Sequence, residues 1–151
     1  MIATTGAHLL PASALHILHT RLLPLATIVT PNVPEALRLL ENTSPENDAL
    51  IARGVRNVDD LEAVGRAIRR LGPRWVLVKG GHCPFRADGT AAGAEGERER
   101  VVDVLVGGGG GGKGEEVVVV VRMETGYCET RHTHGTGCSL ACEFFSFAFF
   151  F

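Results

Sequence analysis

The 151-residue chain is 45% hydrophobic and 21% charged, the composition of a soluble globular domain with one modest core. Its formal net charge of -2 offers no electrostatic basis for binding a nucleic acid or an anionic membrane. The four cysteines form no C-x-x-C pair, which argues against a zinc ribbon, and the first residues resemble no signal peptide. We therefore expect a cytoplasmic protein with free thiols.

The N-terminal part of the chain alternates between short apolar runs and a helical pattern. Residues 1–5 and 26–30 are apolar runs, which predicts two strands. Between them, leucines recur at helical spacing and predict a helix over residues 11–23.

The next part of the chain holds another helix and strand. Residues 41–56 are polar and turn-rich. A helix with one apolar stripe follows, capped by Asn57 or Asp59 and ended by a Gly-Pro pair. Residues 75–78 are apolar and predict a strand. Because strands and helices alternate, the pattern favours an α/β sheet with parallel neighbours.

Asn32 and Glu35 lie between the strand over residues 26–30 and a helix continuing over residues 36–40. An asparagine followed three residues later by glutamate is close to a capping box, and Pro34 suits a first helical turn. On these local grounds a structural role is at least as well supported as a functional one.

Three polar residues follow predicted strands: Asn32, Lys79 and Cys138. Ligands of α/β sheets gather beyond the carboxyl ends of the strands, so these residues could face one crevice. A lysine at a strand end is usually only solvated, but the adjacent Gly-Gly pair favours a phosphate contact at Lys79.

A glycine-rich stretch separates two β-branched strands that we expect to form an antiparallel hairpin, residues 101–106 and 117–121, after an irregular charged loop over residues 84–100. The stretch almost matches a Walker A loop. However, Gly114 stands where a hydroxyl should bind Mg²⁺, and a strand follows instead of a helix. A flexible insertion is the better interpretation.

The hexapeptide Thr-His-Gly-Thr-Gly-Cys at residues 133–138 precedes a helix-compatible run. Glycines let successive N–H groups converge, and a helix N-terminus adds a positive dipole, so the segment could bind an oxyanion with Cys138 at its mouth. A plain turn with a buried cysteine is the alternative. A metal site of His132, His134 and Cys138 fits no standard zinc spacing.

Five segments occur together and in one order along the chain. They are Met-Ile-Ala-Thr-Thr-Gly at residues 1–6, residues 22–36, Val-Leu-Val-Lys-Gly-Gly-His at residues 76–82, Val-Asp-Val-Leu at residues 102–105, and residues 133–138. They resemble the hydroxymethylpyrimidine/phosphomethylpyrimidine kinases of thiamine biosynthesis, members of the ribokinase-like superfamily. The resemblance covers residues 1–142, and the joint pattern is specific although each piece alone is weak.

The resemblance implies an ATP-dependent, Mg²⁺-assisted kinase that phosphorylates the hydroxymethyl group of the pyrimidine and then its monophosphate. It implies that Gly135, Thr136, Gly137 and Cys138 form an anion hole for the transferred phosphoryl group. Cys138 is then the general base on the substrate hydroxyl, where most ribokinase-like relatives use aspartate.

The resemblance also assigns the phosphate side of the site. Asn32 and Glu35 match an N-x-x-E element near Mg²⁺ and the phosphates, with Glu35 on the metal side. Lys79 lies by the ATP phosphates, and Asp103 is a nucleotide-side or structural residue. Such donors supply the positioning and charge neutralisation that phosphoryl transfer needs.

The resemblance implies an α/β fold: a partial ribokinase-like sandwich, with a mainly parallel central sheet flanked by helices and a C-terminal β-hairpin before the anion-hole helix. Residues 1–142 form the C-terminal portion of the kinase domain, and residues 143–151 an aberrant tail with six of the seven phenylalanines.

Family members carry a further N-terminal half with most of the pyrimidine pocket, so we expect a truncated kinase. Its partner is a small pyrimidine, and a family-like homodimer is conceivable. Two alternatives stay open: a pyridoxal kinase of the same cysteine-containing type, or a non-catalytic, folding-compromised fragment.

Overall fold

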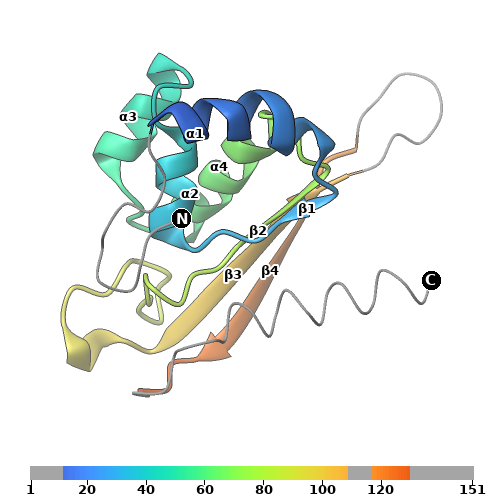
Figure 1. The fold of residues 1–151 in the computed structure, drawn as a ribbon. Coiled ribbons are helices and arrows are strands. Elements are labelled where there is room, and N and C mark those ends of the chain that lie inside the picture. The colour runs from blue at the N-terminus through green and yellow to red at the C-terminus, as the bar shows by residue number, and fades with distance from the viewer. Residues whose placement is uncertain (1–11, 109–116, 130–151) are drawn as a thin grey trace.

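A computed structural model describes residues 12–108 and 117–129, which form one sheet with helices on one of its faces (Figure 1). The strand predicted over residues 1–5, the anion-hole segment and the phenylalanine-rich tail lie outside the described residues. In chain order the elements are α1 (Ala12–Ile17), the π-helical turn η1 (Leu18–Leu22), the 3₁₀ turn η2 (Leu23–Leu25), β1 (Ile28–Val29), α2 (Val33–Leu40), α3 (Pro45–Arg53), α4 (Val58–Arg69), β2 (Trp75–Val78), the 3₁₀ turn η3 (Glu95–Glu97), β3 (Arg100–Gly107) and β4 (Val119–Gly126).

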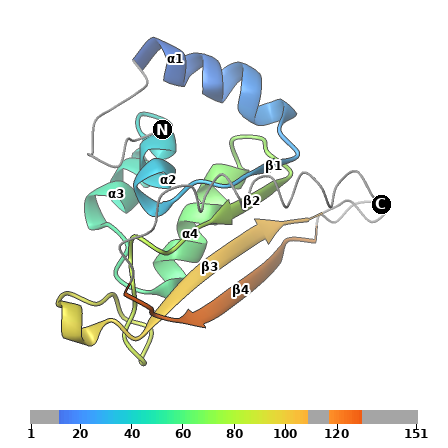
Figure 2. The same ribbon diagram turned by 60° about the horizontal axis from the view of Figure 1, so that its bottom comes forward.

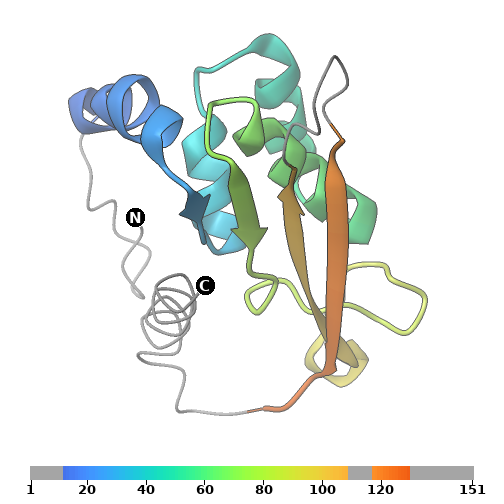
Figure 3. The same ribbon diagram turned by 90° about the vertical axis from the view of Figure 1, so that its right-hand side faces the viewer.

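The sheet has the order β1-β2-β3-β4 (Figure 3). The expected α/β class is confirmed, and β1 pairs with β2 in parallel. The mainly parallel sheet is not seen among the described strands, because β2 with β3 and β3 with β4 pair antiparallel. The reason lies in the link over residues 79–99, which holds only the short η3 turn. A parallel return would need a crossover connection, usually a helix.

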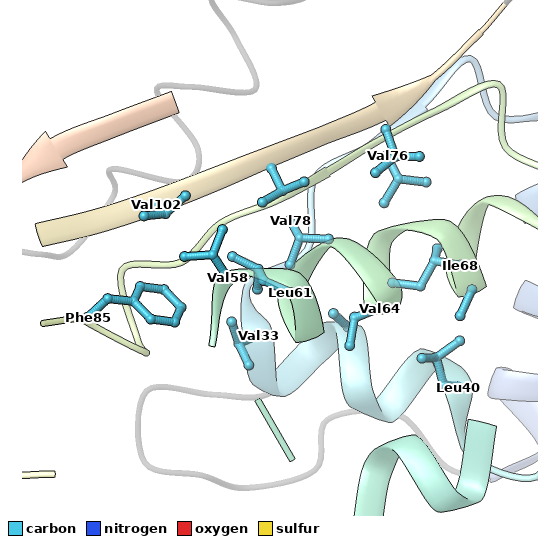
Figure 4. Packing of buried hydrophobic residues seen from close by; sticks show 14 residues of the cluster. Val33, Leu40, Val58, Leu61, Val64, Ile68, Val76, Val78, Phe85 and Val102 are labelled. Carbon is cyan, nitrogen blue, oxygen red and sulfur yellow. The ribbon is translucent and has the colours of Figure 1, made fainter. Parts of the chain in front are cut away.

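The hydrophobic core lies between the sheet and helices α2 and α4 (Figure 2). Valines of β2 and β3 point toward the apolar stripe of α4, and α2 packs behind it (Figure 4). Alternate strand residues face the core because side chains of a strand point to opposite faces in turn. Fully buried members of this cluster include Leu40, Leu61, Val64, Ile68, Val76, Val78, Phe85, Val102, Val104 and Val106.

Asparagine caps begin two of the helices. Asn32 caps α2 together with Glu35 in the capping box that the sequence indicates. Asn57, not Asp59, caps α4, and its Oδ1 accepts a hydrogen bond of 2.8 Å from the backbone N–H of Asp60. These side chains satisfy backbone donors that the first turn of a helix leaves unpaired.

Two helical segments differ from the sequence-based expectation. Residues 41–56 are not only polar turns, because helix α3 begins after Ser44, whose Oγ accepts from the N–H of Asn47 at 3.2 Å. Pro45 suits its first position. The helix predicted over residues 11–23 is shorter, since α1 gives way to the π-helical turn η1.

The predicted hairpin is present, with its first strand close to its expected bounds. Its second strand extends to Gly126 rather than ending at residue 121. At the other end of the ladder Gly107 pairs with both Trp75 and Val119. The β3–β4 connection therefore leaves the sheet beside the start of β2, at the end opposite Lys79.

No helix in residues 12–108 and 117–129 has the length and apolar content that crossing a bilayer requires.

An ion-pair cluster joins β4 to α4. Arg122 donates to Asp59 at 2.6 Å and to Glu62 at 2.8 Å. The guanidinium of Arg122 is the largest influence that lowers the pKa of Glu62 below its usual 4.5, and Arg66 adds to the effect.

We expect Arg122→Ala to raise the pKa of Glu62 toward its usual value, because the main partner of its carboxylate is lost. In the native protein this pairing stabilises the fold above the usual pKa and is lost as the pH falls through the lower folded-state value. NMR titration of the Glu62 carboxyl measures the shift. Arg100→Ala is the matched control, since Arg100 pairs with Glu124 instead, and an unchanged Glu62 titration in R122A would contradict the assignment.

Candidate phosphate-binding site at the strand ends

The carboxyl ends of β1 and β2 bring two of the predicted residues side by side. The backbone N–H of Lys79 donates to the carbonyl of Pro31 at 2.9 Å, and Asn32 and Lys79 form a parallel backbone bridge. Both side chains are half-buried. Because the two strands are parallel, their ends meet at one edge of the sheet, where ligands of such folds gather.

The N-terminus of α2 lies at the same edge. Asn32 Oδ1 accepts from the N–H of Glu35 at 2.9 Å, and the N–H of Asn32 donates to Glu35 Oε2 at 3.2 Å. These bonds are the structural role that the sequence indicated. Two side-chain atoms take no part in this capping box: Nδ2 of Asn32 and Oε1 of Glu35. The eight-residue helix also directs its positive dipole end toward the neighbourhood of Lys79.

Asp103 reaches the same edge from β3. Its Oδ1 accepts a hydrogen bond of 2.8 Å from the backbone N–H of Gly80, the residue that follows Lys79. The last regular pair of β2 and β3 is Val78 with Val104, so the contact lies just beyond the ladder. Asn32 and Lys79 therefore meet through a backbone bridge, the Asp103 side chain joins them through the N–H of Gly80, and Glu35 joins them through Asn32.

A tight turn continues from Lys79. The N–H of Cys83 donates to the carbonyl of Gly80 at 2.8 Å. A Cβ on Gly80 would overlap the carbonyl oxygen of Val102, so only glycine fits there. Burial raises the pKa of the Cys83 thiol, which favours its protonated form.

The other predicted catalytic residues, Gly135, Thr136, Gly137 and Cys138, lie outside the described residues, as do His132 and His134. Within residues 12–108 and 117–129, no group of three or more His, Cys, Asp or Glu side chains is arranged to hold a metal ion.

The arrangement suits an anion. A lysine and the positive dipole end of a helix lie together at the strand ends and supply the positive potential that favours a phosphate group. Sequence reasoning did not identify the contact between Asp103 and Gly80. The sequence feature that could have indicated this contact is the acidic residue inside the otherwise apolar run Val-Val-Asp-Val-Leu-Val.

A family model described as phosphomethylpyrimidine kinase matches residues 1–147. The hydroxymethylpyrimidine/phosphomethylpyrimidine kinase of Streptomyces coelicolor is 36% identical over 142 residues, which are 93% of this chain and 39% of that protein. A Schizosaccharomyces pombe protein named for the same two kinase activities is 35% identical over 147 residues, 97% of this chain and 24% of that protein. The chain thus spans well under half the length of these curated relatives.

Solved structures show the same fold. The pyridoxal kinase of Staphylococcus aureus in complex with ADP is similar with a TM-score of 0.59 at 20% sequence identity. The match covers 93% of this chain and 39% of that one. At this identity the likeness concerns the fold alone.

Proposed function

Because the chain belongs to the phosphomethylpyrimidine kinase family, we propose that it carries the phosphate-binding side of an ATP-dependent kinase. The substrates are hydroxymethylpyrimidine and its monophosphate, and the products are the monophosphate, the diphosphate and ADP. The observation that carries this proposal is the position of Lys79 beside the N-terminus of α2. In a reducing cytoplasm the proposed base, Cys138, would not be held in a disulfide.

Lys79 and the positive dipole end of α2 would attract and orient the ATP phosphates. Both sources of positive potential lie at one sheet edge, so a phosphate group there would contact them together. Gly135, Thr136 and Gly137 would direct backbone N–H groups at the phosphoryl group in transit. Such preorganised donors favour the transition state because they need no rearrangement as charge develops.

Cys138 would remove the proton from the attacking hydroxyl. Transfer of the γ-phosphoryl group breaks its bond to the β-phosphate oxygen and forms a bond to the substrate oxygen. The substrate proton passes to Sγ of Cys138, which would act as a thiolate and become a neutral thiol. A positioned base supplies this proton transfer within the site instead of relying on solvent.

The residues at the strand ends fit Mg²⁺ as well as phosphate. Glu35 offers a carboxylate oxygen beyond the one in the capping box, and Mg²⁺ prefers oxygen ligands. Glu35, with the side-chain oxygen of Asn32 nearby, would hold the ion on the phosphate side. Magnesium, when bound, neutralises charge on the phosphate oxygens.

Lys79→Ala tests the proposal in the purified chain supplied with ATP, Mg²⁺ and hydroxymethylpyrimidine. Loss of the charged contact should raise the KM for ATP about tenfold or more, because hydrogen bonds to charged groups contribute roughly 1.5–3 kcal/mol. Mass spectrometry of the phosphorylated pyrimidines and ADP release measure the rate.

Arg74→Ala is the matched control, since Arg74 is an exposed cation at the opposite end of β2. Pyridoxal as a parallel substrate distinguishes the alternative kinase activity. Absence of any phosphorylated product from the native chain would contradict the catalytic proposal and favour a non-catalytic fragment.

A further inference from the structure

Asp103 is an acidic residue within the otherwise apolar run over residues 101–106 of β3. In β3 its neighbours Val102 and Val104 are fully buried against α4, and Asp103 points to the other face of the sheet. Its carboxylate accepts the N–H of Gly80 at 2.8 Å across 23 positions of sequence. An ionised acceptor makes this a charge-assisted hydrogen bond, stronger than one between neutral groups.

Three hydrogen bonds fix the turn that Asp103 holds. The N–H of Lys79 is bonded to Pro31, the N–H of Gly80 to Asp103, and the carbonyl of Gly80 to Cys83. Close contact with the backbone of Val102 leaves no room for a side chain at position 80. The direction in which the chain leaves β2, and with it the base of the Lys79 side chain, therefore depends on these contacts.

A direct role for Asp103 on the nucleotide is less consistent with this geometry. One carboxylate oxygen is already bonded to a backbone amide. A carboxylate beside phosphates would repel them, and the repulsion grows as water is excluded. The bond to the amide of Gly80 instead gives this carboxylate a role on the turn.

We propose that Asp103 is a positioning residue, which holds the Lys79–Gly80 turn and so keeps the backbone of Lys79 beside the N-terminus of α2. The inference rests on the proposed function, because it assumes that Lys79 contacts the ATP phosphates. It resolves the two roles that the family resemblance left open for Asp103 in favour of an indirect one. Asp103 then affects the affinity for ATP and has little effect on the chemical step.

Asp103→Ala and Asp103→Asn separate anchoring from charge. Asparagine keeps a side-chain oxygen that can accept the Gly80 N–H, whereas alanine does not. With MgATP as the probe, D103A should weaken binding and raise the KM on the order of tenfold, with kcat changed less than twofold. D103N should recover most of the lost affinity. Asp48→Ala is the matched control, because Asp48 also accepts a backbone N–H, that of Asn42 at 3.3 Å, far from the strand ends.

A double-mutant cycle with Lys79→Ala tests whether Asp103 acts through the lysine. If it does, D103A should cost affinity for ATP in the native background and almost none in K79A. Amide hydrogen exchange at Gly80 gives a readout that does not need nucleotide. It should accelerate about tenfold or more in D103A and stay near the native rate in D103N.

The possible outcomes distinguish the positioning role of Asp103 from the proposed kinase function. Equal ATP affinity of D103A and the native chain, or an equal loss in the K79A background, would overturn the positioning role. A loss in D103N as large as in D103A would assign Asp103 a direct charge role and overturn it too. If the native chain binds no ATP while Gly80 exchange still responds to D103A, the anchoring contact is real but the proposed function fails, and the positioning role fails with it.

Discussion

Replacing Cys138 with alanine should lower the rate of phosphoryl transfer by about 10²–10⁴-fold, the usual contribution of a positioned general base. The substrate hydroxyl would then have to lose its proton to water. Binding of ATP should change little, because the phosphate contacts proposed for Lys79 and α2 do not involve the thiol. Single-turnover formation of the phosphorylated pyrimidine, with ATP affinity measured separately, checks both parts.

Cys128→Ala is the matched control for this experiment, since Cys128 is an exposed free thiol outside the site. Cys138→Asp adds a positive test. The resemblance implies that aspartate is the base in most members of the wider ribokinase-like superfamily, so C138D should retain more activity than C138A. A C138A protein that turns over within threefold of the native rate would exclude the thiol as the base.

Replacing Phe85 with alanine should lower the free energy of unfolding by about 3–5 kcal/mol, the range for truncating a buried phenylalanine. The Phe85 ring is fully buried in the core cluster. Its backbone also pairs with Ala91 and Arg100, so it joins the β2–β3 link to the sheet. Native domains are stable by only about 5–15 kcal/mol, and the loss is therefore a large share of the total.

Urea unfolding followed by circular dichroism measures the effect of F85A. Leu25→Ala is the control, since the Leu25 side chain is 84% exposed and its truncation should cost under about 0.5 kcal/mol. A native chain without a cooperative transition would instead support a folding-compromised fragment. A loss below 1 kcal/mol in F85A would show that the β2–β3 link does not contribute to the core as described.

The sequence predicted the parts of the fold that short-range chemistry decides. Asn32 and Asn57 are helix caps because their side-chain oxygens reach amides three residues on. The apolar run over residues 75–78 was sufficient to predict the strand there. Helix α3 was not predicted, because its composition is polar and the Ser-Pro pair that begins it was interpreted as part of a turn.

Pairing direction was harder to predict than the strands themselves. The link over residues 79–99 contains many turns, and nothing local shows whether the chain crosses the sheet or returns beside β2. The strand-end argument correctly placed Asn32 beside Lys79, since it relies on parallel pairing alone. The bond from Gly80 to Asp103 joins residues 23 positions apart, and no periodic pattern encodes such a contact.

The β3–β4 connection departs from the sheet at Gly107 and Val119, beside the start of β2. The whole length of the strands separates this exit from the lysine. A change in the length or composition of the glycine tract should therefore leave the proposed phosphate side of the site in place. For the same reason the tract is the place to graft an affinity tag or a fluorophore when the chain is studied in cells.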